Sequence, residues 1–465
     1  MHTNQVRQVK VYHKQEEAGS RTPIDLFKGL KGNQKSMLES SFSQDERGMY
    51  SFIGTDPVLD IASDDQQTKV HNTRTNEQCT YEGDALDFIK DFQDPVDFPL
   101  DLPFYGGWIG YVGYDAIRSY VHIGERKENP LHMPDIHLLL YDTVIIFDHQ
   151  AQIIHYVAIA FHQENMDTLK NRVENLIQTS NAETSLQTTT PTLHFKEMEH
   201  KELFLQQVKD AQQVMAEEGL EQVVLSKRFV ASGVENPLTV YEKLRDSNPS
   251  PYMFHLEFGP YTLLGTSPES VVQITGDQVL TNPIAGTSPR GESLEEDYRL
   301  QQELLTNEKE MAEHRMLLEA SKQEMHSICE HGTITIPVCS SVEMFEYVMH
   351  IVSNVQGTLK EDFTSMDALM QLLPAGTVSG TPKTEAMRLI NAYESTSRGA
   401  YGGTVGYINA NFDMNMALAI RCMTVKDKRA YIQAGAGIIP ASIPEKEYEE
   451  IHHKLRSLTS VNDVL

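Results

Sequence analysis

The first part of the chain alternates apolar and polar residues in short runs, as in MYSFIGTDPVLDIAS (49–63) and AQIIHYVAIAFH (151–162). A period of two places every second side chain on one face of a strand, so these runs predict β-strands that cover a core. The most apolar stretch, IHLLLYDTVIIF (136–147), is interrupted by Asp142 and predicts a pair of buried strands.

The second part mixes strand-like runs with longer helical periods. Strands are predicted in EQVVLSKRFVAS (221–232), YTLLGT (261–266) and AYIQAGAGII (430–439), and helices over 200–218 and 307–332. Strand pairs often follow each other without an intervening helix, which favours antiparallel sheets over a doubly wound parallel sheet. The expected fold class is therefore α+β.

A segment rich in Ser and Thr, QTSNAETSLQTTTPT (178–192), separates the two parts and is typical of a linker or a long surface loop. It predicts an N-terminal domain over residues 1–177 and a second domain over 193–465, both within the usual size of domains. A loop inside one continuous fold is the alternative.

Charge and composition narrow the class of protein. The 465 residues carry a net charge of −27, which argues against nucleic acid or an anionic membrane as the main partner. The N-terminus lacks the apolar region of a signal peptide, and no apolar run is long enough to cross a bilayer. Cys79, Cys329, Cys339 and Cys422 show no CxxC spacing, so neither a zinc site nor a disulfide framework is indicated. A soluble, cytoplasmic protein is expected.

Two segments, NEKEMAEHRM (307–316) and PEKEYEEIHHK (444–454), repeat one spacing of carboxylates. Asn307 followed by Glu310, and Ser442 followed by Glu445, are patterns of helix starts. Residues three apart share a helix face, so two pairs are expected to project together; they are Glu310 with Glu313 and Glu447 with Glu450. Two such pairs facing one cleft would supply oxygen ligands for Mg²⁺. A solvated helix face is the alternative.

Six motifs carry a resemblance to the chorismate-utilising enzymes. In chain order they are PIAGTSPRG (283–291), VMHIVSNVQG (348–357), LLPAGTVSGTPK (372–383), RGAYGGTVGYI (398–408), ALAIRCM (417–423) and QAGAGII (433–439). The resemblance covers nearly all of residues 200–465 and extends more weakly into the N-terminal part. Within the family the chain is similar to the large synthase subunits of anthranilate synthases. It implies sheets packed as a sandwich with helices outside, and an N-terminal regulatory domain.

The resemblance also implies roles for individual residues. Glu269 matches the family's general acid, His350 its base and Thr377 a hydrogen-bonding group near the ring; the four glutamates would hold Mg²⁺. One substrate carboxylate would bind the metal, while the other needs donors such as a guanidinium fork or backbone N–H groups. The expected substrate-binding residues are Gln222, Ala285, Gly286, Thr287, Tyr401, Arg421, Gly435, Ala436, Gly437 and Lys454.

The nucleophile follows from two positions. Members that add water carry a Lys where this chain has Gln222, and many aminodeoxychorismate synthases carry a Lys where it has Ala285. The resemblance therefore implies addition of ammonia at C2 of chorismate, then loss of pyruvate to give anthranilate for tryptophan biosynthesis. None of the four cysteines lies on a Gly-flanked elbow, so a separate glutaminase subunit (component II) would supply ammonia within a hetero-oligomer. The alternatives are an aminodeoxychorismate synthase component I of the folate pathway and a non-catalytic tryptophan- or partner-binding scaffold.

Two further segments resemble the tryptophan feedback site of anthranilate synthases. These are MLES (37–40) and NPSPYMF (248–254), which offer Glu39, Ser40, Pro251, Tyr252 and Met253 to an amino-acid ligand. Separately, the chain departs from the family pattern at LEASKQEM (318–325) and at Ser288, both expected near the catalytic site.

Overall fold

The computed structural model describes residues 7–40, 49–93, 95–97, 101–161, 163–181, 192–344 and 348–459. Most of its strands belong to two large, antiparallel sheets, here called sheet I and sheet II. Sheet I runs in the order β13 (Lys196–Glu197), β14 (Gln222–Ser232), β26 (Arg429–Ile438), β25 (Cys422–Lys426), β16 (Thr262–Ser267), β15 (Tyr252–Glu257), β3 (Ser36–Glu39), β4 (Tyr50–Gly54), β11 (Thr143–Asp148), β12 (Ile153–Ile159) and β2 (Val11–Glu17), with β22 (Gly380–Thr381) paired to β14.

Sheet II also has 12 strands among the residues described. Its order is β19 (Ile284–Pro289), β21 (Val348–Thr358), β18 (Gln278–Thr281), β17 (Ser270–Thr275), β24 (Met414–Leu418), β23 (Thr404–Asn409), β9 (Gly107–Val112), β10 (Ile136–Tyr141), β5 (Leu59–Asp64), β6 (Gln67–Asn72) and β7 (Glu77–Glu82), with β20 (Thr335–Met344) paired to β21. The short strands β1 (Arg7–Gln8) and β8 (Val96–Asp97) pair separately. The expected α+β sandwich is confirmed.

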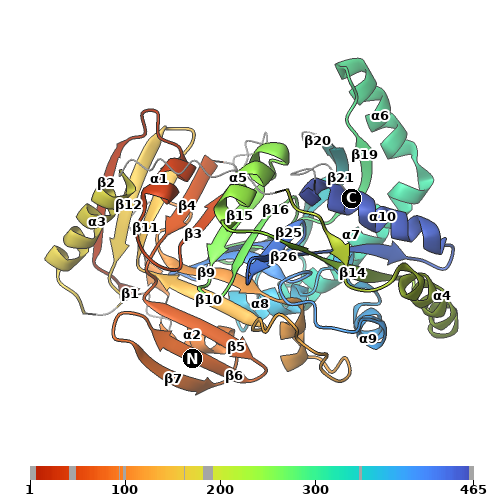
Figure 1. Cartoon of the computed structure of the whole chain (residues 1–465), viewed down its shortest axis with the longest axis horizontal. Helices are drawn as coiled ribbons and strands as arrows, with labels where there is room; N and C mark the ends of the chain where they lie inside the picture. Colours follow the sequence, from red (N-terminus) through yellow and green to blue (C-terminus); the bar gives the residue numbers. More distant parts are fainter. Residues whose placement is uncertain are drawn as a thin grey trace.

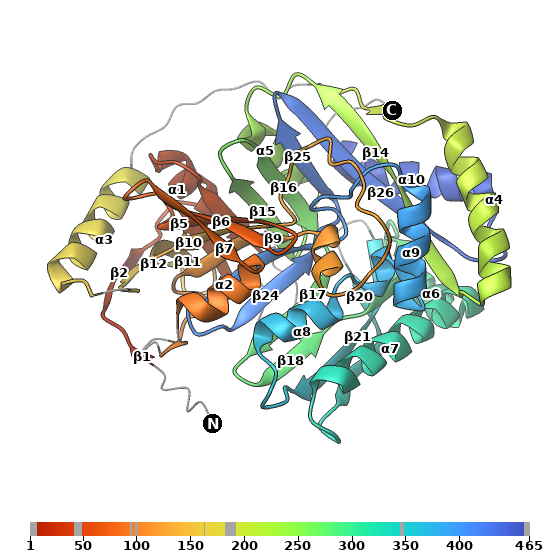
Figure 2. The same cartoon turned by 90° about the horizontal axis from the view of Figure 1, so that it is seen from below.

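Helices surround the sheets (Figure 1). They are α1 (Pro23–Gly29), α2 (Ala85–Phe92), α3 (Met166–Ser180), α4 (Lys201–Glu218), α5 (Pro237–Ser247), α6 (Leu294–Thr306), α7 (Glu308–Ile328), α8 (Ser365–Leu372), α9 (Lys383–Tyr393) and α10 (Pro444–Thr459), with short 3₁₀ turns η2 (Tyr114–Ser119) and η3 (Gly376–Val378). Helix α3 lies at one end of the molecule and α4 at the other, while α6 projects from the body (Figure 1). Viewed from below, α7, α8 and α9 lie on one side of the molecule (Figure 2).

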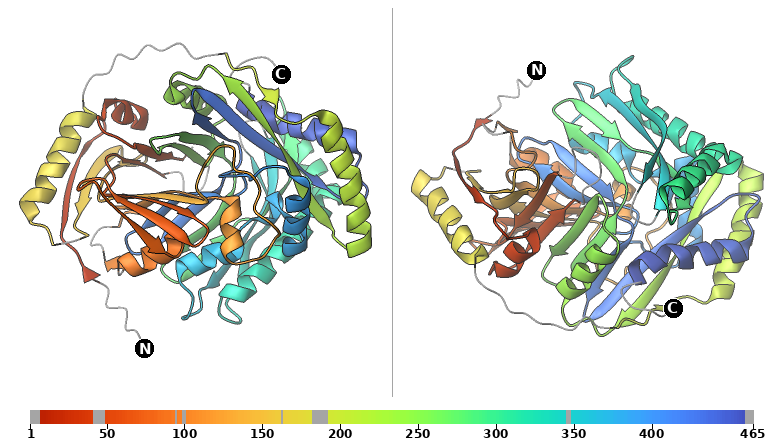
Figure 3. Two further views of the ribbon diagram at one scale, coloured as in Figure 1. Left: turned by 60° about the horizontal axis from the view of Figure 1, so that its bottom comes forward. Right: turned by 90° about the horizontal axis from the view of Figure 1, so that it is seen from above.

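Both sheets contain strands from both predicted domains. In sheet I, β3 of the N-terminal part pairs with β15 of the C-terminal part; in sheet II, β9 pairs with β23. Figure 3 shows the N-terminal strands running alongside the later ones. The division at 178–192 stays a prediction, because residues 182–191 lie outside the described residues; α3 extends three residues beyond 177, to Ser180.

The core lies between the sheets. Phe52 of sheet I makes edge contacts with Phe104 and with Tyr407 of sheet II, at centroid distances of 5.4 and 5.3 Å. The pair of strands predicted around Asp142 is present as β10 and β11. The Asp142 carboxylate is buried there, and it accepts hydrogen bonds from Arg74 (2.7 and 2.8 Å) and Arg172 (2.6 Å). A buried carboxylate is tolerated when it is paired in this way.

The helix starts read from the sequence are both present. Asn307 caps α7, accepting hydrogen bonds from the N–H groups of Lys309 (3.0 Å) and Glu310 (3.3 Å). Helix α10 begins at Pro444, two residues after Ser442. The Ser442 hydroxyl accepts a hydrogen bond from the N–H of Ile439 (3.0 Å), which precedes the helix. In the ranges that the structure describes, none of the helices has the length and apolarity needed to span a bilayer.

Candidate active site

Glu269 lies in the short turn between β16 and β17, and its backbone carbonyl accepts from the N–H of Leu418 (2.9 Å). The carboxylate is buried, and its Oε1 accepts a hydrogen bond from Thr377 Oγ1 (2.9 Å). Burial raises the pKa of Glu269 to about 7, against the opposing effects of Thr377, Arg421 and Lys454. A carboxyl group with this pKa retains its proton near neutral pH, as a general acid must.

His350 is positioned by a bulge in the neighbouring strand. Where β19 pairs with β21 the register shifts at Gly286, whose φ of +72° lies in the left-handed region that favours glycine. The Gly286 carbonyl can only accept, so it fixes the proton of His350 on Nδ1 (3.0 Å) and leaves Nε2 as the basic nitrogen. Burial, then the Arg421 charge, lowers the pKa of His350 to about 4. The imidazole is therefore neutral at neutral pH, and its Nε2 carries no proton.

Arg421 connects these two groups. Its guanidinium acts electrostatically on both Glu269 and His350, so it lies near both. Burial lowers its pKa, against the opposing charge of Glu269. Within the described residues the guanidinium has no hydrogen-bond partner, so its fork can bind a carboxylate of a ligand.

Glycines bring two further side chains close to the strand β26. A Cβ on Gly435 would lie 3.0 Å from the Tyr401 hydroxyl, and one on Gly437 would lie 2.5 Å from Gln222 Nε2. Gln222 is buried, and its Oε1 has no partner among the residues that the structure covers. A buried acceptor without a partner is costly, so this oxygen is available to a donor on a bound molecule.

The glutamates of α7 and α10 lie within electrostatic range of each other through Glu313 and Glu450. Burial raises the pKa of Glu313, and the charges of Glu310 and Glu450 raise it further; burial and then the Glu450 charge raise that of Glu447. Lys454 lies beside them, with Nζ 2.8 Å from Glu450 Oε1 and 2.9 Å from the Gly435 carbonyl.

These carboxylates are the type of ligand that a hard cation such as Mg²⁺ prefers, because they offer only oxygen atoms. A bound cation would also relieve their mutual repulsion. In the described ranges, however, no three acidic, histidine or cysteine side chains converge closely enough to hold one ion. Glu310 Oε2 accepts instead from the Thr287 N–H (3.3 Å). The donor set therefore fits Mg²⁺ by type, and the convergence expected from the sequence is only partial.

A small pocket opens beside Glu269 and Thr377, with about 40 Å³ of space for the centres of water-sized molecules. Its far wall is formed by α7, through Ala320, Ser321 and Glu324 of the segment that departs from the family pattern. The departing segment therefore lies at the catalytic site, as the sequence predicts. Ser288, the other departure, is buried in β19.

Sequence reasoning missed one buried ion pair. Arg398 donates to both carboxylate oxygens of Glu394 (2.8 and 2.6 Å), and to the carbonyls of Val378 (2.7 Å) and Val224 (2.8 Å). It lies in the motif RGAYGG, but nothing local distinguishes it from a surface arginine. Its guanidinium lies 5.7 Å from the Tyr401 ring and ties β14, η3 and the Tyr401 loop together.

The two segments expected to form a feedback site do meet. Glu39 at the end of β3 is opposite Met253 of β15. Glu39 is buried, and its Oε2 accepts from Tyr241 (2.6 Å) and pairs with Arg245 (3.0 Å). The sequence indicated this carboxylate but not its two partners from α5.

The sequence matches the family of chorismate binding enzymes over residues 33–460. This chain belongs to that family, which the motif order and the fold had indicated. It is 38% identical to anthranilate synthase component 1 of Lactococcus lactis, over 96% of this chain and 99% of that protein, and 37% identical to that of Acetivibrio thermocellus, over 95% and 92%.

Solved structures agree. Anthranilate synthase component I from Streptococcus pneumoniae superposes with a TM-score of 0.83 at 35% identity, over 96% of this chain and 99% of that one. The menaquinone-specific isochorismate synthase from Escherichia coli gives a TM-score of 0.73 at 18% identity and shares the fold.

Proposed function

We propose that this protein is the synthase component I of an anthranilate synthase, converting chorismate and ammonia to anthranilate and pyruvate. The observation that carries the proposal is the burial of Glu269 and His350 around the Arg421 charge, which acts on both, with burial favouring the protonated form of Glu269 and the neutral form of His350. Near full-length likeness to anthranilate synthase component 1 of Lactococcus lactis supports it. It acts in the cytoplasm and in tryptophan biosynthesis.

In the first step ammonia adds at C2 and the C4 hydroxyl leaves as water. Glu269 supplies the proton that makes the hydroxyl a leaving group, and Thr377 holds the carboxyl in place. Gln222 supports ammonia as the nucleophile, because an amide is a poor base for activating water while its buried Oε1 can accept an N–H of ammonia. The product of this step is 2-amino-2-deoxyisochorismate.

In the second step the C2 proton is removed and the C3–O bond breaks, so that enolpyruvate leaves, takes up the abstracted proton and becomes pyruvate, while the ring becomes aromatic. His350 is the base, through the Nε2 that its Nδ1 hydrogen bond leaves unprotonated. Arg421 and Tyr401, with backbone N–H groups near Gly435 and Gly437, orient one substrate carboxylate.

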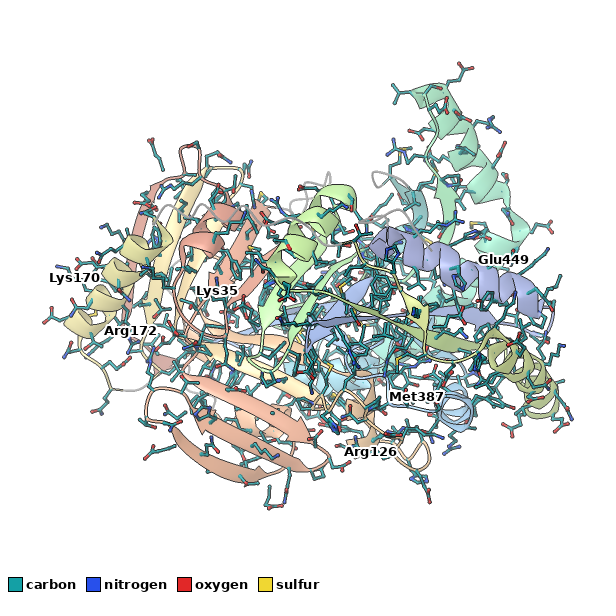
Figure 4. All side chains as sticks on the ribbon, viewed as in Figure 1. Lys35, Arg126, Lys170, Arg172, Met387 and Glu449 are labelled. Carbon is teal, nitrogen blue, oxygen red and sulfur yellow. The ribbon has the colours of Figure 1, made fainter. Side chains whose placement is uncertain are left out.

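Mg²⁺ would be held by Glu310, Glu313, Glu447 and Glu450, and when bound it neutralises charge on the other substrate carboxylate. We expect Glu447→Gln to raise the Mg²⁺ concentration for half-maximal activity by more than roughly 10–100-fold, the cost of losing even an outer-shell partner. The measurement is activity and calorimetric binding against Mg²⁺ with chorismate present. Glu449→Gln, an exposed neighbour on α10 (Figure 4), is the control and should match wild type. If both variants show the same Mg²⁺ dependence, the glutamates of α10 do not bind the metal and form only a solvated helix face.

The decisive assay uses ammonium, chorismate and Mg²⁺ without any partner protein. Anthranilate fluorescence and a product mass equal to anthranilate are expected, whereas a 4-amino product would support an aminodeoxychorismate synthase. No product would favour a non-catalytic scaffold. With glutamine in place of ammonium, activity should require a glutaminase partner, component II.

We further propose that tryptophan inhibits the enzyme by binding where β3 meets β15. Glu39 offers its Oε1 to the ligand ammonium, because Tyr241 and Arg245 both engage Oε2. Ser40 supplies a polar contact, and Pro251, Tyr252 and Met253 wall the indole. The N-terminal part then has a regulatory role, because a ligand at this strand pair favours one arrangement of the two parts.

Ser40→Phe is expected to weaken tryptophan binding by at least tenfold, because a phenyl group at the end of β3 would fill space needed by the ligand; this corresponds to roughly 1.4 kcal/mol. Calorimetric titration of tryptophan into wild type and variant is the measurement. Catalysis without tryptophan should be retained by the variant. The assignment fails if wild type binds no tryptophan at millimolar concentration, or if both proteins bind it equally.

A further inference from the structure

The pocket beside Glu269 has a polar lining on both sides. Helix α7 presents Leu317, Ala320, Ser321 and Glu324 to it, a spacing that places all four on one helix face. On the opposite side lie Glu269, Ser270, Thr281 and Thr377. Two carboxylates from distant parts of the sequence therefore open onto the same space.

Ser270 gives an independent indication of what this space holds. Its side chain is buried with 5% exposure, and its Oγ has no hydrogen-bond partner among the residues that the structure describes. Buried hydroxyl groups are nearly always hydrogen-bonded, to protein or to ordered water. The pocket's space of about 40 Å³ exceeds the roughly 10–15 Å³ that one water molecule needs, and the polar groups in its lining offer hydrogen bonds to such a molecule.

The proposed reaction creates a need that this pocket can meet. In each turnover the Glu269 proton leaves with the C4 hydroxyl as water, so the carboxylate must regain a proton before the next turnover. Glu269 is buried and lines the pocket, so the proton must reach it through the water that the pocket holds. Glu324 is half-buried, with 23% of its side chain exposed, and so touches both solvent and the pocket.

We propose that water in this pocket relays protons from Glu324 to Glu269, which makes Glu324 the proton-supply residue of the enzyme; this rests on the proposed function. Glu324 takes a proton from solvent and passes it to pocket water, and the water gives one to the Glu269 carboxylate. The ammonium group formed by addition of ammonia releases one proton to solvent. Charge and protons therefore balance over a turnover.

Charged groups lie at both ends of the relay. Lys383 Nζ lies 2.7 Å from Glu324 Oε1 and also donates to the Leu372 carbonyl (3.0 Å), so it fixes Glu324 at the edge of the pocket. At the other end Glu269 faces Thr377, with Arg421 and Lys454 as the nearby positive charges.

The test separates the first turnover from later ones by stopped-flow anthranilate fluorescence. Glu324→Gln should form its first anthranilate at the wild-type rate, because Glu269 already carries its proton. Later turnovers should slow by about tenfold, a modest part of what a proton-transfer group contributes. Added imidazole, a small proton carrier, should restore them, and the KM for chorismate should not change.

Two further variants test the role of the pocket and control for changes on α7. Ala320→Leu fills the pocket and should slow later turnovers without rescue by imidazole. Glu319→Gln, exposed on α7 and paired with Lys322 (2.8 Å), is the matched control and should behave as wild type. The relay is overturned if Glu324→Gln keeps the wild-type steady-state rate, if its first turnover is slowed equally, or if imidazole has no effect. Wild type that makes no anthranilate would instead overturn the proposed function.

Discussion

Replacing Glu269 by glutamine is expected to lower anthranilate formation by about 10²–10⁴-fold, the usual contribution of a positioned proton-transfer group. Glutamine has nearly the same shape and its amide oxygen can still accept the Thr377 hydrogen bond. It cannot supply an acidic proton to the C4 hydroxyl. Binding of chorismate should be largely retained, so the loss should appear in kcat, measured by anthranilate fluorescence with ammonium as donor.

The same residue determines how activity depends on pH. Because the acid must be protonated, wild-type kcat/KM should fall as the pH rises through about 7, and because His350 must be neutral it should fall again as the pH drops towards about 4. Glu269→Gln should lose the alkaline decline. Retention of that decline in the variant would assign the acid to another group.

Glu269→Gln should lower activity but raise thermal stability at alkaline pH. The pKa of Glu269 is higher in the folded protein than its ordinary value of 4.5, so the folded state binds the proton more tightly. The associated stabilisation is fully present below about 4.5 and is lost as the pH rises through about 7. Above that pH, Glu269→Gln should have a higher Tm than wild type, although it is far less active.

Arg398→Met is expected to lower the free energy of unfolding by about 3–5 kcal/mol, the cost of breaking a buried ion pair on one side. The substitution leaves the Glu394 carboxylate largely buried without its cation, and it removes donors from the carbonyls of Val378 and Val224. Urea denaturation of wild type and variant gives the difference. Arg398→Lys should be only partly effective, because an ammonium cannot reproduce the guanidinium fork.

Arg388→Met is the matched control for that experiment. Arg388 pairs with Glu385 on α9 at 4.0 Å, and both side chains are exposed, at 57% and 43%. Exposed pairs contribute about 0–1 kcal/mol, so little change in stability is expected. Similar losses in the Arg388 and Arg398 variants would contradict the importance assigned to the buried pair.

The sequence predicts local features of this protein well. The apolar run interrupted by Asp142 identifies the two buried strands on either side of it, and Asn307 identifies the start of α7, because these signals depend on neighbours along the chain. The motif order also indicates the family. A resemblance of this kind transfers a role to each residue without requiring its surroundings to be known.

Features that depend on distant partners are not readable in this way. A period of two shows which face of β3 is buried, but not that β15 will pair with it. Glu39 was identified without Tyr241 and Arg245, and Arg398 was passed over, because burial and ion pairing are set by chain segments far apart in sequence. The pocket at α7 likewise exists only once α7 packs beside Glu269.

The sharing of both sheets by the two parts of the chain has a consequence for biosynthesis. As the chain leaves the ribosome, β3 and β9 emerge with one edge unpaired, and their partners β15 and β23 are made only some 200 and 300 residues later. Exposed strand edges invite pairing between molecules, and long-range pairing is slow. Expression of the N-terminal segment without the rest of the chain should therefore yield aggregates, because these strand edges then have no partner to cover them.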